Sequence, residues 1–197
     1  MNENLKPTLW RTARALSNTG RLKLMRLVAN AKGVKGVVEL AEEVGLSVAV
    51  TSIYLRQLNA RGLISVVRSG PYVYYGTGSD RSLPVAIEIQ KAFQRLFSRK
   101  KLPSDWTERL MPVLHAYSHF RREIIIRDLL KHDHINYAEL LRCSGFSEPT
   151  FLRHLNILLK AEVVSKDKKG CYFITKPKNS LESVLLSYVV NKGGWYE

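Results

Sequence analysis

Six polar or charged residues between positions 147 and 156 are expected to point outward from one helix, and their chemistry is recognition by hydrogen bonds. A guanidinium such as that of Arg153 can donate two parallel hydrogen bonds to neighbouring acceptors, and the amide of Asn156 can both donate and accept. The carboxylate of Glu148 can only accept. The full set is Ser147, Glu148, Thr150, Arg153, His154 and Asn156.

Base edges in the DNA major groove offer matching partners. Arg153 fits the O6 and N7 acceptors of guanine, a contact that discriminates between bases by roughly 1–3 kcal/mol. Glu148 could accept from cytosine N4, while Ser147 and Asn156 could contact bases or phosphates. Three lysines follow in a short β-rich segment and suit phosphate contacts: Lys166, Lys168 and Lys169.

The element that positions such a helix is clearest earlier in the chain, between Val44 and Thr77. Gly45 interrupts one helical pattern, and Ser47 is placed to cap the next helix by accepting from its first free backbone N–H groups. Gly62 can end that helix in the left-handed conformation that glycine tolerates. The buried face of the helix carries Thr51, Leu55 and Leu58 at helical spacing.

A hairpin is expected after this helix. Two β-rich runs, Leu63–Val67 and Tyr72–Tyr75, are separated by the turn sequence Ser69-Gly70-Pro71. The order helix, tight turn, helix, hairpin is the layout of a winged helix-turn-helix. In that fold the second helix enters the major groove.

The same stretch recurs about a hundred residues later. A shift of 100 aligns the turn glycine, the cap and the buried leucines, and upstream a shift of 101 aligns Ala15 with Ala116, Arg21 with Arg122 and Arg26 with Arg127. We therefore predict a tandem repeat, with an N-terminal domain at 1–100 and a C-terminal domain at 104–197. The aligned pairs at a shift of 100 include Glu39–Glu139, Leu40–Leu140, Gly45–Gly145, Ser47–Ser147, Leu55–Leu155, Leu58–Leu158, Gly70–Gly170 and Tyr72–Tyr172.

Three segments of the first half read ALSNTGRLKLMRLVA, VVELAEEVGLSVAVTSIYLRQLNARGLI and VRSGPYVYYGT. They resemble the ArsR type of bacterial winged-helix transcriptional regulator. The resemblance covers residues 9–77 well and residues 110–175 more weakly. It implies DNA binding by a homodimer with one such domain per subunit, so two domains in one chain suggest an intramolecular pseudo-dimer or a homodimer that carries four domains.

The expected fold is mostly α (α+β): two tandem winged helix-turn-helix domains, each with three to five helices and a two-stranded β wing. A helix at 82–100 follows the first wing, and a helix at 179–191 echoes it. In the resembled family such a terminal helix builds the dimer interface. The alternative is a connector that packs on its own domain. Met111-Pro112 is expected to kink or delay the first helix of the second domain.

The outward residues of the first domain differ from those of the second, because Ile53 occupies the position of Arg153. Apolar side chains can touch thymine methyl groups but read little else. This helix therefore either reads T-rich DNA, helped at the backbone by Arg61, or contacts a protein. The candidate DNA-binding residues here are Ser47, Val48, Val50, Ser52, Ile53, Tyr54, Arg56 and Arg68.

The chain of 197 residues has a net charge of +14, which favours a nucleic-acid partner. Residues 1–100 contain 16 Lys/Arg and 6 Asp/Glu, giving +10, and residues 101–197 contain 15 and 11, giving +4. No apolar run is long enough for a membrane span, and no secretory signal is read at the N-terminus, so a cytoplasmic protein is expected.

No cofactor, metal site or enzymatic activity is expected. The cysteines, Cys143 and Cys171, lie in different elements, and the histidines lack convincing ligand spacing. No phosphate-binding glycine loop or nucleophile motif is present.

The leading function is a sequence-specific double-stranded DNA-binding transcriptional regulator, most simply a repressor that occludes a promoter. The alternatives are a plasmid-type replication initiator and a protein-interaction module built on tandem winged helices. The sequence does not identify a small-molecule effector.

Overall fold

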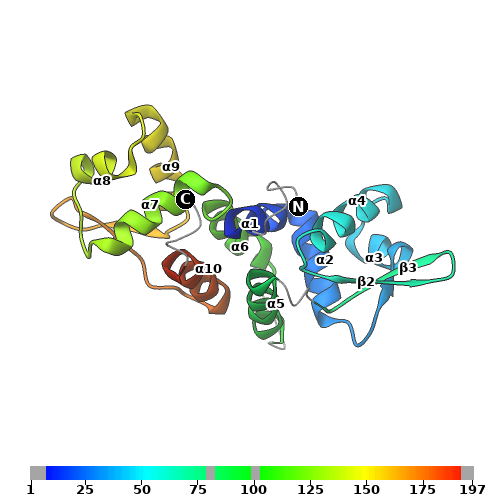
Figure 1. Cartoon of the computed structure of the whole chain (residues 1–197). Helices are drawn as coiled ribbons and strands as arrows, with labels where there is room; N and C mark the ends of the chain where they lie inside the picture. Colours follow the sequence, from blue (N-terminus) through cyan, green and yellow to red (C-terminus); the bar gives the residue numbers. More distant parts are fainter. Residues whose placement is uncertain (1–7, 79–82, 99–102, 192–197) are drawn as a thin grey trace.

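The computed structural model describes residues 8–78, 83–98 and 103–191 (Figure 1). The first half contains three short strands and five helices in the described ranges. In chain order they are α1 (Leu9–Leu16), α2 (Thr19–Asn30), β1 (Lys35–Gly36), α3 (Val37–Val44), α4 (Val48–Asn59), β2 (Ser65–Ser69), β3 (Tyr72–Gly76) and α5 (Pro84–Phe97).

The second half has the same order of helices and a shorter hairpin. Its elements are α6 (Trp106–Ala116), α7 (Phe120–Lys131), α8 (Tyr137–Ser144), α9 (Glu148–Lys160), β4 (Val164–Lys166), β5 (Tyr172–Ile174) and α10 (Ser180–Asn191). The chain is therefore mostly helical, with a wing-like hairpin after α4 and a second hairpin after α9. Among the described helices, none is long and apolar enough to cross a membrane.

Both hairpins are antiparallel and gain a third partner from the segment before the helix-turn-helix. In the first half the strand order is β1-β3-β2, with Val67 opposite Tyr74. In the second half β4 pairs with β5, and a single bridge between Ile135 and Tyr172 takes the place of β1. Gly70, the first residue of the two-residue turn between β2 and β3, has a φ of 57°, which favours glycine.

Side chains cap several helix starts, among them the start of α4, where the cap predicted at Ser47 is present. Asn18 accepts from Arg21 N, Ser47 from Val50 N and Asn136 from Glu139 N, each at 3.0–3.3 Å. Gly45 ends α3 in the left-handed conformation, with a φ of 72°, as expected.

The predicted cap by Ser147 is wrong. Its hydroxyl donates to Thr150 Oγ1 at 3.1 Å, and the side chain caps no backbone N–H of α9. Pro149 explains the difference in part, because it removes one of the amides from which a cap side chain could accept.

The predicted helix boundaries agree closely where the chain is described. The helices predicted at 82–100 and 179–191 correspond to α5 and α10. A late start at Met111-Pro112 is wrong, since α6 begins at Trp106 and includes Pro112. Residues 82, 99 and 100 of the first predicted helix lie outside the described residues, as do 101–102 of the predicted domain boundary.

An arginine closes the turn between the first two helices in each half, and it is half-buried in the first half and buried in the second. Arg21 Nε donates to the carbonyl of Ala15, and Arg122 Nε donates to the carbonyl of Ala116 at 2.8 Å. Arg122 donates further to His115 O at 2.6 Å and to the Ser118 hydroxyl at 3.0 Å. The residues that align at a shift of 101 thus make the same hydrogen bond in both halves.

The two halves pack through equivalent helices: α1 contacts α6, and α5 contacts α10 (Figure 1). The rings of Phe93 and Phe97 in α5 are stacked, with 5.2 Å between their centres. The rings of Phe97 and Trp106 are nearly perpendicular, with 5.3 Å between their centres. Ser180 at the start of α10 donates to the carbonyl of Ala92 at 3.2 Å. Two helices of the first half thus contact the helices at the same place in the order of the second half. The buried apolar residues of the two halves form one continuous core.

We expect the substitution Arg122→Ala to destabilise the protein by about 2–4 kcal/mol, because it removes a buried side chain and takes from the carbonyl of Ala116 its hydrogen bond with Arg122 Nε. Urea unfolding measures the change. Arg109→Ala is the matched control, since Arg109 makes only an exposed ion pair with Asp105 and should cost at most about 1 kcal/mol. Equal losses for the two variants would contradict the structural role of Arg122.

Candidate nucleic-acid interface

The helix α4 is fixed to the first half by its inner face and presents the opposite face to solvent. Thr51, Leu55 and Leu58 are buried against the core. Of the predicted site residues in this half, the exposed ones are Ser47, Val48, Ile53, Arg56 and Arg68, and the half-buried ones are Val50, Ser52 and Tyr54.

Tyr54 has a packing role in addition to any contact with a ligand. The guanidinium of Arg21 lies 5.3 Å from the centre of its ring. A Cβ atom at Gly20 would lie only 2.8 Å from Cε2 of the same ring, so α2 approaches α4 closely here. Tyr54 therefore helps to set the position of α4 against α2.

Apolar side chains dominate the exposed surface around α4 and its hairpin. Ile53 is 45% exposed and Tyr72, beside the hairpin turn, is 65% exposed. Val66 and Val67 of β2 are exposed as well. This surface offers methyl groups and one phenol, with Arg56 and Arg68 as the exposed cations among the predicted residues.

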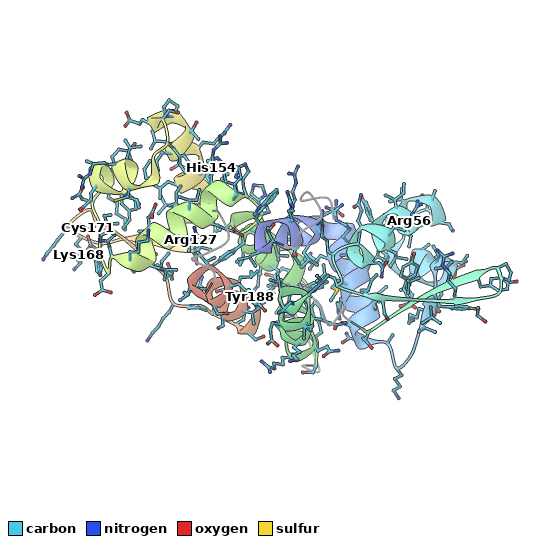
Figure 2. The ribbon with its side chains drawn as sticks, in the orientation of Figure 1. Arg56, Arg127, His154, Lys168, Cys171 and Tyr188 are labelled. Carbon is cyan, nitrogen blue, oxygen red and sulfur yellow. The ribbon has the colours of Figure 1, made fainter. Side chains whose placement is uncertain are left out.

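The exposed surface of α9 is mostly polar, with Leu152 as an exposed apolar side chain. Phe151, Leu155 and Leu158 are buried beneath it, and the Glu148 carboxylate accepts a hydrogen bond from the Tyr137 hydroxyl at 2.9 Å. The exposed predicted residues are Ser147, Glu148, Arg153, Asn156, Lys166, Lys168 and Lys169, and Thr150 is half-buried. Figure 2 shows Arg56 and Lys168 towards opposite ends of the molecule.

The second hairpin is organised by a carboxylate in its turn. Asp167 accepts from the backbone N–H groups of Lys169 and Cys171 at 2.8 and 2.9 Å, and lies 2.8 Å from His134 Nδ1. These hydrogen bonds, led by the one from Cys171, hold the pKa of Asp167 below its usual value. The ionised carboxylate thereby fixes the backbone that carries Lys168 and Lys169.

The prediction that His154 points outward is wrong. Only 3% of its surface is exposed, its Nδ1 lies 3.4 Å from Arg122 Nη1, and its ring centre lies 4.6 Å from that of His119. His154 aligns with Tyr54, so both residues face the arginine that closes the turn between the first two helices. Burial, followed by the charges of nearby groups, lowers the pKa of His154 to about 4. The imidazole is therefore neutral at pH 7.

A cluster of cations lies between α4 and α9 and was not predicted as a site. Arg11 and Arg14 of α1 lie near Arg61 at the end of α4. Burial, followed by the charges of Arg122, Arg121, Arg14 and Arg153, lowers the pKa of His119. The sequence offers one signal for this cluster, the excess of arginine in α1 and at the start of α2. The pattern within a single helix does not show that these arginines lie near α4.

The part of the chain that the structure describes contains no group of three or more His, Cys, Asp or Glu side chains that could hold a metal ion. Cys143 is exposed, Cys171 is half-buried, and both are free thiols.

Residues 18–66 match the model of a family described as bacterial regulatory protein, arsR family. The matched segment runs from the cap of α2 through α3 and α4 to the start of β2. This part of the chain is thus similar to the helix-turn-helix of that family, while the interpretation of the second half depends on its own geometry. No curated protein and no solved structure matched the chain.

We expect the replacement His154→Asn to weaken the loss of stability at acidic pH. The folded state lowers the pKa of His154 to about 4, so between pH 6.5 and 4 the unfolded chain binds more protons at this residue. Stability is therefore lost as the pH falls through this range. Urea unfolding at pH 6.5 and 4.5 should show a loss that is roughly 1–3 kcal/mol larger in the wild type than in the variant. The variant His132→Asn, which changes an exposed side chain, should follow the wild type.

Proposed function

We propose that this protein is a sequence-specific double-stranded DNA-binding transcriptional regulator that acts as a repressor by covering a promoter. The observation that carries the proposal is the recurrence of one arrangement. In each half a helix-turn-helix presents the outer face of its second helix to solvent, next to an antiparallel hairpin. The similarity of residues 18–66 to arsR-family regulators supports it, as does the net charge of +14.

In this proposal α9 reads the bases of one half-site. Arg153 is exposed on the outer face of α9 and donates to guanine O6 and N7, and Asn156 lies one turn further along the helix. Glu148, Ser147 and Thr150 at the start of α9 contact neighbouring bases or phosphates. Lys166, Lys168 and Lys169 bind the phosphate backbone beside the groove. His154 supports Arg122 beneath the helix and does not touch DNA.

The helix α4 reads the other half-site mainly through apolar contacts. Val48, Val50 and Ile53 fit thymine methyl groups, which project into the major groove. Ser47 and Ser52 add hydrogen bonds, and Arg56 and Arg68 contact phosphates. The first half therefore prefers A·T-rich DNA and discriminates less sharply than the second half.

One chain provides both half-site contacts. The packing of α1 on α6 and of α5 on α10 supports this proposal, because it joins the half that carries α4 to the half that carries α9 through one core. We therefore expect the free protein to be monomeric in analytical ultracentrifugation. The half-sites should be unlike each other, because Ile53 and Arg153 occupy equivalent positions.

The exposed apolar surface of the first half favours a second function, in which α4 and its hairpin contact a protein. Val48, Ile53, Val66, Val67 and Tyr72 are all at least 40% exposed. In that case DNA binding should be weak and insensitive to sequence.

Selection of bound duplexes from a random pool at near-physiological salt tests these functions. A motif with two unlike half-sites about 10 base pairs apart, one turn of DNA, supports the proposed regulator. A palindrome would mean that two chains pair on one site. Binding that enriches no motif and collapses with added salt would be driven by phosphates alone and would favour the protein-interaction module.

We expect Arg153→Ala to weaken binding to the selected motif by roughly 1–3 kcal/mol and to relax the preference at one base pair. Ile53→Ala should weaken binding less, because it removes only an apolar contact. Fluorescence anisotropy with the motif and with single-base variants measures both effects. Equal losses for the two variants, or no loss for Arg153→Ala, would contradict the assignment of α9 as the main reader of sequence.

A further inference from the structure

A groove of about 440 Å³ lies between α1 and the end of α4, and its lining is strongly cationic. Four arginines line it: Arg11, Arg14, Arg21 and Arg61. The remaining lining residues that the structure describes are Trp10, Ala15, Gln57 and Ala60, and none of them carries a carboxylate.

The arginines are held by different contacts. Arg21 is fixed by its hydrogen bonds to the carbonyl of Ala15 and to Gln57 Oε1, the latter at 2.9 Å. The guanidinium of Arg11 lies 5.0 Å from the centre of the Trp10 ring. Burial, followed by the charge of Arg11, lowers the pKa of Arg61, so these two cations act on each other across the groove. Arg14 is exposed at the rim.

The aligned positions of the second half show that the fold does not require this charge. The places of Arg11, Arg14, Arg21 and Arg61 are taken there by Pro112, His115, Arg122 and Ala161, so only the arginine that closes the turn recurs. A different groove of the second half lies between α6, the end of α9 and the start of α10, and is lined by three acids and three bases: Glu108, Glu162, Glu182, Arg109, Lys160 and Lys178. Lys178 pairs with Glu162 within it.

The cationic groove is continuous with the outward face of α4 and lies on the side towards α9. Ile53, Gln57 and Arg61 are spaced four residues apart and so follow one stripe of the helix surface. The charges of Arg14 and Arg153 both act on His119, which brings the rim of the groove within electrostatic reach of α9. Figure 1 shows α1 between α4 and α9.

We propose that this groove binds backbone phosphates of the DNA segment between the two half-sites. The inference rests on the proposed function, in which α4 and α9 enter successive major grooves. On the face of the duplex between them lies the minor groove, bordered by the phosphates of both strands. Arg11, Arg14 and Arg61 lie where those phosphates pass, and Arg21 keeps α1 and α4 at the required separation.

The number of phosphate contacts can be measured from the dependence of DNA affinity on salt concentration. The test variant is Arg11→Gln/Arg14→Gln/Arg61→Gln, which keeps Arg21. The matched control removes the same number of positive charges from the mixed-charge groove of the second half: Arg109→Gln/Lys160→Gln/Lys178→Gln. The probe is a mixed-sequence duplex of about 30 base pairs, long enough for two half-sites one turn apart. Thermal unfolding verifies that each variant is folded, and Arg14→Gln alone, at an exposed residue, replaces the triple variant if that one unfolds.

Each lost phosphate contact reduces the slope of log affinity against log salt by about 0.9. We expect the slope to fall by about 2–3 in the test variant and by less than about 1 in the control. The single variant Arg14→Gln should lower the slope by about 1. An unchanged slope in the test variant, or equal changes in test and control, would overturn the proposal.

Duplexes with uncharged methylphosphonate linkages at the centre of the selected motif locate the contact. These linkages should weaken binding by the wild type and have little further effect on the test variant. Equal weakening of both proteins would overturn the proposal. So would an unchanged slope together with variant-sensitive binding of inorganic phosphate, which would assign the groove to a free anion. If no motif is selected, the proposed regulator fails, while the slope on mixed-sequence DNA still decides the role of the groove.

Discussion

The packing of α5 against α10 is the constraint on which the rest of the structure depends. Ile89 and Phe93 of α5 and Leu181 and Leu185 of α10 are fully buried in one core that both halves share. Separating the halves would expose these side chains, and each large apolar side chain returned to water costs about 1.5–3 kcal/mol. Together with the contact of α1 on α6, this packing joins the half that carries α4 to the half that carries α9.

The two halves share interior hydrogen bonds but differ in the side chains at their surfaces. Arg21 and Arg122 make the same hydrogen bond to the end of the preceding helix. The residue that faces each arginine from the second helix of the helix-turn-helix differs: Tyr54 contributes the face of its ring, and His154 contributes a ring nitrogen. Each contact holds that helix against the turn between the first two helices. Neither contact sets two positive charges against each other, because Tyr54 and His154 are both neutral at pH 7.

The features that were predictable from the sequence are those decided by local chemistry. A left-handed glycine, an asparagine cap and an apolar stripe act within a few residues, so Gly45, Asn136 and the boundaries of α3 follow from pattern alone. His154 could not be placed in this way, because its orientation depends on Arg122, which lies 32 residues earlier in the chain. The arginine groove was missed for the same reason, since it needs α1 and the end of α4 to meet.

The uneven distribution of charge agrees with different roles of the two halves in the proposed function, in which the first half depends more on phosphate contacts and the second half more on base contacts. The first half carries +10 of the net charge and an apolar outward helix, and the second half carries +4 and a polar one. Methyl contacts supply little affinity for a polyanion, so a half that depends on them needs phosphate contacts from elsewhere. The arginines of α1 and the end of α4 meet that need without touching a base. The second half can then bear fewer cations, because Arg153 and its neighbours gain energy from the bases themselves.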